Sequence, residues 1–223
     1  MERFWFVTLR QLGFVLAISA NAQEVVHLSV SATMDIYRAG GFNDGSNGIA
    51  PVDYVFSARP GRILEFTSVT GTWTCDPSTP PFGPDGITAV GPGCYPPTII
   101  VGPVGTFSSY YANDFAGAMV GMFLADTLPT TAPPTRSFYF YNASHGGIRT
   151  SFTALAPAVG QVFFIGDGVT GTGTGRTQAF FVPETATHLY LGFVDSCNTT
   201  PEPGCYSDNS GTLTATVGIY SIE

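Results

Sequence analysis

The chain has 223 residues, of which 44% are hydrophobic and only 11% charged, with 27 Gly and 17 Pro. This composition suits short strands joined by turns and argues against a helical bundle. The formal net charge is -8 and there is no lysine, which excludes Schiff-base and P-loop lysine chemistry and disfavours nucleic-acid binding.

The first 22 residues have the features of a secretory signal peptide. Arg3 and Arg10 flank the n-region, residues 12–20 supply an apolar run, and Ala20-Asn21-Ala22 has the form of a cleavage site. We therefore expect cleavage after Ala22 and a mature chain, residues 23–223, that is secreted or held at the cell surface. Arg10 argues against a membrane-spanning helix, and no later segment is long and apolar enough to be one.

Alternating or apolar runs bounded by Gly and Pro predict strands along the mature chain. We expect them at residues 25–32, 52–56, 62–69, 116–124, 137–141, 152–155, 161–165, 176–182, 188–194 and 213–219. The nearly continuous apolar run at 116–124 is typical of a buried central strand. Since no convincing amphipathic helix interrupts this series, the sequence predicts one all-β domain, an antiparallel β-sandwich.

Two loops are rich in glycine. Residues 166–175 contain G-x-G-x-G, but no helix pattern follows, so a phosphate-binding loop is not indicated. The loop at 40–48 contains Asn43, Asp44 and Asn47, whose oxygens are possible ligands for a cation. A solvated turn is the interpretation that we prefer for this loop.

Four cysteines fit an oxidising compartment. Three pairings are possible, and the sequence alone does not choose between them. We expect local pairing, Cys75 with Cys94 and Cys197 with Cys205, because each bond would hold together a Pro- and Gly-rich loop. A zinc site is disfavoured, because there is no C-x-x-C spacing and there are few histidines.

The segment C-Y-S-D-N-S-G at 205–211 has oxygen-bearing side chains in two adjacent residues, Asp208 and Asn209. Asp195 follows the preceding expected strand. If that strand and the last one are neighbours, a hairpin brings Asp195, Asp208 and Asn209 together, and such oxygen ligands favour Ca²⁺ over Zn²⁺. Asp-Asn-Ser-Gly is also an ordinary turn sequence, so the residues alone leave both interpretations open.

Several stretches resemble the galactophilic, calcium-dependent bacterial lectins of the LecA type. The most specific is F-V-P-E-T-A-T-H-L-Y-L-G-F-V-D at 181–195, followed after a loop by Y-S-D-N-S-G-T-L-T-A-T-V-G at 206–218. Supporting stretches are P-G-R-I-L-E-F-T-S-V-T-G-T-W at 60–73, F-G-P-D-G at 82–86 and F-A-G-A-M-V-G-M-F-L at 115–124. The resemblance implies a galactose-binding-domain-like, jelly-roll sandwich.

In these lectins the strand-end Asp, two adjacent residues after a Tyr, and two backbone carbonyls hold Ca²⁺, which takes two sugar hydroxyls as further ligands. The resemblance implies that the ligands here are Asp195, Asp208, Asn209 and the carbonyls of Cys205 and Thr74, with Cys75 in place of Thr74 if the register shifts by one residue. Relative to these lectins, residues 128–161 are an insertion. The loop after Asp195 is also longer here.

Three further residues are candidates for contact with a sugar: Asp85 as a hydroxyl acceptor, and Tyr206 and Tyr95 by stacking on the sugar ring. Since most aromatic residues of a sandwich belong to its core and Asp85 lies in a turn sequence, a structural role is the alternative that we prefer for each. The lectins' sugar-contacting His and Gln have no match, because Val90 lies near the His position. The resemblance therefore does not imply galactose as the sugar.

The expected function is that of a secreted lectin that binds carbohydrate through Ca²⁺. The alternative is a surface or assembly protein that Ca²⁺ stabilises and that binds no sugar. We do not expect an enzyme, because the sequence has neither G-x-S-x-G nor H-E-x-x-H. A homo-oligomer is compatible with the sequence.

Overall fold

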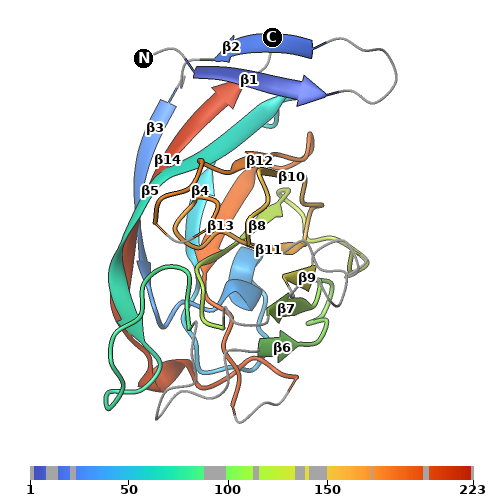
Figure 1. Cartoon of the computed structure of the whole chain (residues 1–223). Coiled ribbons are helices and arrows are strands. Elements are labelled where there is room, and N and C mark those ends of the chain that lie inside the picture. The colour runs from blue at the N-terminus through green and yellow to red at the C-terminus, as the bar shows by residue number, and fades with distance from the viewer. Residues whose placement is uncertain are drawn as a thin grey trace.

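The computed structural model describes residues 3–8, 15–20, 24–87, 99–112, 116–133, 139–140, 150–171, 173–197 and 201–221. Two main sheets of mostly antiparallel strands form a sandwich, which confirms the all-β fold (Figure 1). Two 3₁₀ helices that matter for the site are η1 (Ile36–Gly41) and η4 (Tyr206–Asp208).

The larger sheet has the strand order β10-β12-β5-β14-β3. Its strands are β3 (Glu24–Ser31), β5 (Arg62–Thr74), β10 (Ala154–Leu155), β12 (Ala179–Phe181) and β14 (Ser210–Ser221). Strands β5 and β14 run antiparallel side by side, from the pair Thr74–Ser210 to the pair Arg62–Ser221 (Figure 1). Both extend beyond their predicted ranges. One consequence is that Thr74 lies opposite the residue after Asn209.

The second sheet has the strand order β11-β8-β13-β4. Its strands are β4 (Val52–Val55), β8 (Val120–Leu124), β11 (Val162–Phe164) and β13 (His188–Gly192). Strand β8 is buried along its whole length, as its apolar run predicts. It begins later than expected, because Gly117 has a φ of +67° and a Cβ there would lie 2.1 Å from the Trp73 ring.

Among the residues that the structure describes, five further strands lie outside these two sheets. They are β6 (Ile99–Val101), β7 (Tyr110–Ala112) and β9 (Tyr139–Phe140) in a small sheet, and the pair β1 (Arg3–Thr8) and β2 (Val15–Ala20). Strands β6 and β7 were not expected from the sequence. The β1–β2 hairpin occupies the segment interpreted as a signal peptide. Within the described parts of the chain, no helix is long and apolar enough to cross a membrane.

Aromatic side chains join the two main sheets. Phe163 of β11 lies against Phe180 of β12 with ring centroids 5.3 Å apart, and Trp73 of β5 lies 5.4 Å from Phe193, just after β13. Each of these four side chains is at most 2% exposed. Burial of a large apolar side chain stabilises a fold by about 2–3 kcal/mol, so this core fixes the relation between the sheets.

Strands β13 and β14 belong to different sheets, so the hypothesis of a hairpin between them is wrong. Strand β13 pairs with β8 and β4, whereas β14 pairs with β5 and β3. The chain instead crosses from one sheet to the other between Gly192 and Ser210. Asp195 and Asn209 lie at the two ends of this crossover.

Candidate functional site

Asn209 and Asp195 are in direct contact at the crossover. The amide nitrogen of Asn209 donates to Asp195 Oδ2 (2.9 Å) and to the carbonyl of Ala32 (3.1 Å). Both partners are acceptors, which settles the orientation of the amide. Asn209 is only 5% exposed, and its Oδ1 is buried without a hydrogen-bond partner. A buried, unpaired carbonyl oxygen costs about 1–3 kcal/mol, so this atom points to a ligand.

Asp195 is partly exposed and carries a perturbed carboxyl group. Its Oδ1 accepts from the backbone N–H of Ser196 (2.7 Å). Burial, with a smaller contribution from the Asp208 charge, raises the pKa of Asp195 to about 7, although the hydrogen bonds from Asn209 and Ser196 lower it. The two hydrogen bonds thus do not fully offset the cost of burying the charged carboxylate, and a bound cation would offset the rest.

The crossover loop is closed by a disulfide. Cys197 and Cys205 are bonded, which confirms this half of the expected pairing. Cys205 has a φ of 63°, a left-handed conformation that is uncommon for a residue other than glycine. The loop then enters η4, which ends at the exposed Asp208. The disulfide therefore limits how far the two ends of the crossover can move apart.

Thr74 approaches the same place from β5. It pairs with Ser210, the residue after Asn209. Its hydroxyl contacts the hydroxyl of Thr79 (2.8 Å) and the carbonyl of Asp76. Within the described ranges no group of three or more His, Cys, Asp or Glu side chains is placed to hold a metal. The candidate set has only two carboxylates, and its other members offer neutral oxygens.

The candidates for sugar contact are placed differently. Tyr206 is fully buried, which leaves no ring face for a sugar to stack on. Asp85 is 8% exposed, and its Oδ1 accepts from the backbone N–H of Asp167 (2.9 Å). Tyr95 and Cys94 lie outside the described residues, although Cys75 is disulfide-bonded.

Tyr206 supports the crossover from inside. Its hydroxyl accepts from the backbone N–H of Asp195 (3.1 Å) and donates to the carbonyl of Phe193 (3.4 Å). Its own backbone N–H donates to Oδ1 of Asn47 (2.9 Å), in the loop 40–48. A segment more than 150 residues earlier in the chain thus holds η4 in place.

Asp35, which no sequence motif marked, lies close to Tyr206, because a Cβ at Gly48 would approach both side chains. It is fully buried; its Oδ1 accepts from the backbone N–H of Tyr37 (2.8 Å) and its Oδ2 from the hydroxyl of Ser46 (2.5 Å). Burial and the neighbouring Asp44 carboxyl raise the pKa of Asp35 to about 7. The available signal was a lone acidic residue in the otherwise uncharged A-T-M-D-I-Y.

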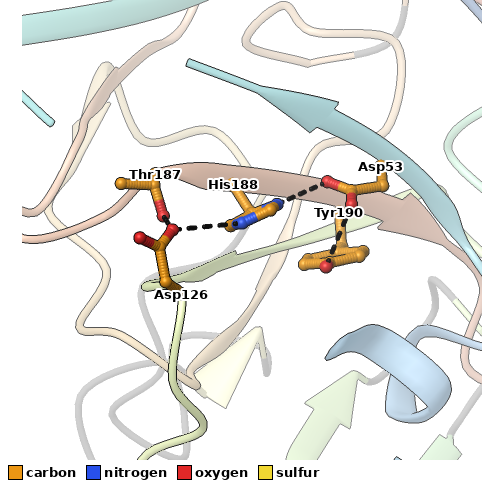
Figure 2. A network of polar contacts seen from close by, with 5 residues as sticks. All are labelled: Asp53, Asp126, Thr187, His188 and Tyr190. Carbon is orange, nitrogen blue, oxygen red and sulfur yellow. Dashed lines mark hydrogen bonds and ion pairs between the residues drawn. The ribbon is translucent and has the colours of Figure 1, made fainter. Parts of the chain in front are cut away.

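A second polar cluster lies at the opposite end of β13 (Figure 2). Figure 2 shows His188 between two carboxylates, with Nδ1 2.9 Å from Asp53 and Nε2 3.4 Å from Asp126. The hydroxyl of Thr187 donates to Asp126 (2.6 Å) and that of Tyr190 to Asp53 (3.1 Å). The Thr187 hydroxyl thus joins the cluster through the Asp126 carboxylate.

Comparison with known protein families gives no match, and comparison with curated proteins gives no significant one. The resemblance to the lectins therefore depends on the quoted sequence motifs alone.

Proposed function

We propose that the chain is a secreted lectin-like protein that binds carbohydrate through a Ca²⁺ ion held at the crossover between its two sheets. The observation that carries this proposal is the unpaired, buried Oδ1 of Asn209 beside the Asp195 carboxylate. Calcium prefers carboxylate, amide and carbonyl oxygens, which are what this end of the sandwich offers.

The proposed ligands are the side chains of Asp195, Asp208 and Asn209 and the carbonyls of Cys205 and Thr74. Asn209 forms the inner wall because it is buried, whereas Asp208 is exposed at the rim. A cation between them would keep one side open to solvent. Two neighbouring hydroxyls of a sugar would replace water on that side, and the ion itself would recognise the sugar.

The test combines calcium titration with a glycan array on the mature, oxidised protein. In Asp195→Asn we expect calcium to bind this site at least about tenfold more weakly, because the isosteric change removes a charged ligand. The titration should therefore show one calcium equivalent fewer than in the wild type. Glycan binding should appear in millimolar calcium, disappear in EDTA and be absent in this variant.

The matched control is Asp126→Asn, which removes a carboxylate at the opposite end of β13. It should bind calcium and glycans as the wild type does. Glycan binding that persists in EDTA, or a calcium affinity unchanged in Asp195→Asn, would contradict the proposal.

A second candidate function is a surface or assembly protein in which the same calcium only holds the crossover together. The burial of Tyr206 and Asp85 favours it, because neither side chain offers a sugar an accessible face. In that case calcium should raise the melting temperature of the wild type while the glycan array stays silent in both conditions.

A further inference from the structure

Two exposed polar side chains beside the crossover are held in one fixed arrangement. Asn47, in the loop 40–48, accepts the backbone N–H of Tyr206 through its Oδ1 (2.9 Å) and donates through its amide nitrogen to the hydroxyl oxygen of Ser207 (2.9 Å). Because a backbone N–H can only donate, the orientation of the Asn47 amide is settled. Asn47 and Ser207 are both exposed to solvent, so this pair is an ordered feature of the surface.

Both groups keep hydrogen-bonding capacity for a ligand. An amide nitrogen has two N–H donors, of which Asn47 uses one, and the Ser207 hydroxyl keeps its own O–H. Within the described part of the chain neither side chain has another protein partner. Since the Asn47 side chain is already ordered, a ligand that binds it would lose little binding free energy to ordering it.

An exposed apolar residue comes two positions after Asn47. Ile49 is 49% exposed, and only Gly48 separates it from Asn47. Its backbone is fixed on both sides, because its N–H donates to the carbonyl of Thr33 (2.9 Å) and its carbonyl accepts the N–H of Asp35 (2.9 Å). A sugar has hydroxyls at the edge of its ring and C–H groups on the faces, so two polar groups and one aliphatic side chain suit it. We call Asn47, Ile49 and Ser207 the η4 patch.

The η4 patch borders the proposed calcium site. Ser207 immediately precedes the proposed ligand Asp208 within η4, and consecutive Cα atoms are only about 3.8 Å apart. Gly48 packs against Tyr206 of the same helix, where a Cβ would lie 3.0 Å from the ring. A sugar unit linked to one that is bound at the ion would therefore lie over this patch.

The charges around the patch favour a neutral ligand. Asp208 is exposed, and the chain as a whole carries a formal net charge of -8. The basic residue nearest to Asn47 along the chain is Arg38, whose guanidinium is engaged with the carbonyls of Gly48 (2.7 Å) and Ser46 (3.3 Å). An acidic sugar would thus meet a carboxylate at the rim, and like charges there disfavour binding.

We propose that the η4 patch is a second subsite, which binds the sugar unit linked to the one at the calcium ion, and that the ligand is a neutral di- or oligosaccharide. This inference rests on the proposed carbohydrate binding at the crossover. Because the two units are covalently linked, the second contact is intramolecular once the first is made, and it raises the affinity of the whole ligand. A free monosaccharide reaches only the ion.

The experiment is calorimetric titration of the mature, oxidised protein with neutral sugars in millimolar calcium. The set pairs galactose with lactose, glucose with cellobiose and maltose, mannose with α-1,2-mannobiose, and N-acetylglucosamine with chitobiose. We expect at least one disaccharide to bind about tenfold more tightly than its terminal monosaccharide, which corresponds to one or two additional hydrogen bonds.

Two variants of the η4 patch test its part in this difference. Ser207→Ala and Ile49→Thr should each lower the ratio of disaccharide to monosaccharide affinity by about three- to tenfold. The matched control is Val55→Thr, at a residue of β4 that is 62% exposed and does not belong to the patch. This variant should keep the wild-type ratio.

The outcomes separate this inference from the proposed function. A monosaccharide that binds as tightly as every disaccharide containing it, or a ratio unchanged in both patch variants, overturns the subsite and leaves the calcium-dependent lectin. Binding of no glycan, on the array or in the titration, overturns both. Tighter binding of a sialylated glycan than of its neutral counterpart on the array overturns the neutral ligand.

Calcium titration of the two patch variants covers a structural role. Both should bind calcium with the affinity of the wild type, because Ser207 and Ile49 are exposed and neither side chain is a proposed calcium ligand. A calcium affinity that falls in step with the disaccharide affinity would show that the η4 patch only supports η4, and would overturn the subsite.

Discussion

The two ends of strand β13 carry polar clusters of opposite design. At its beginning, His188 lies between Asp53 and Asp126, whose side chains are 38% and 81% exposed. Just after its end, Asp195 and the buried Asn209 lie with other acidic groups and no basic side chain in contact among the described residues. The first cluster is open to water and includes an imidazole, whereas the second is more buried, and the cation that we propose would offset its negative charge.

The largest expected effect comes from filling the space between Asp35 and Tyr206. In Gly48→Ala the new Cβ would lie 2.5 Å from Asp35 Cβ and 3.0 Å from the Tyr206 ring. Overpacking of this kind typically costs about 1–3 kcal/mol, and we expect the upper part of that range. Denaturant unfolding measures the loss.

The control for this change is Gly83→Ala, where a Cβ meets nothing within 4 Å. It should alter the free energy of unfolding by less than about 0.5 kcal/mol. Equal effects of the two variants would mean that the Asp195 end is not tightly packed.

Asp85 tests what burial does to a carboxyl group for which no cation is proposed. Burial raises its pKa from 3.8 to about 6, so the folded state binds more protons than the unfolded state between these values. Stability from this group is therefore present in acid and is lost as the pH rises from about 4 to about 6, by about 2 to 3 kcal/mol. Asp85→Asn, which does not titrate, should flatten this dependence.

The measurement is the melting temperature of both proteins from pH 4 to pH 7. The melting temperature of the variant should rise relative to that of the wild type as the pH increases, because the amide does not ionise. The amide oxygen still accepts the Asp167 N–H, so this hydrogen bond is kept. Parallel curves would show that Asp85 ionises without cost in the folded chain.

The hydroxyls of Tyr206 and Tyr190 allow a direct comparison of the two polar clusters at the ends of β13. Tyr206→Phe removes the acceptor of the Asp195 N–H in a buried position, whereas Tyr190→Phe removes a donor to Asp53, which keeps His188 as a partner. We expect a loss of about 1–2 kcal/mol for the first and less than about 1 kcal/mol for the second, by denaturant unfolding. The reverse order would contradict the assignment of Tyr206 as the support of the crossover.

The smallest effect should come from the exposed end. Asp126→Asn weakens one side of the His188 cluster, and exposed ion pairs contribute little to stability. We expect a change within about 0.5 kcal/mol that becomes smaller still in high salt, measured by unfolding at two ionic strengths. A larger loss would mean that the exposed cluster contributes as much to the free energy of unfolding as the buried one.

Much of the sheet framework was predictable from local patterns. The alternation T-L-T-A-T-V marks β14, and the apolar run V-G-M-F-L marks β8, because burial of one or both faces leaves a direct trace in the sequence. The sequence predicted less well which strands pair with one another in the sheets (Figure 1). Strands β13 and β14 follow one another along the chain yet lie in different sheets, a choice made by long-range packing around Trp73 and Phe193.

Part of the candidate site was predicted, but from a strand pairing that the structure does not have. The contact between Asp195 and Asn209 was anticipated from a hairpin that does not exist. The sequence left two roles open for Tyr206, core packing and sugar contact, because the loop that covers it is far away in the sequence. Asp35 was missed since a single acidic residue forms no motif. Such features depend on which distant segments meet, and only the folded chain shows that.

The disulfide between Cys197 and Cys205 has a consequence for the order of maturation. It closes the segment that separates Asp195 from Asn209, so both proposed ligands are held by a bond that forms only under oxidising conditions. In a reducing compartment the crossover would be a longer and looser connection, and ordering it would cost part of the binding energy of an ion. The proposed site would then bind calcium more tightly after oxidation than before it, and a chain kept reduced would need a higher calcium concentration to fill it.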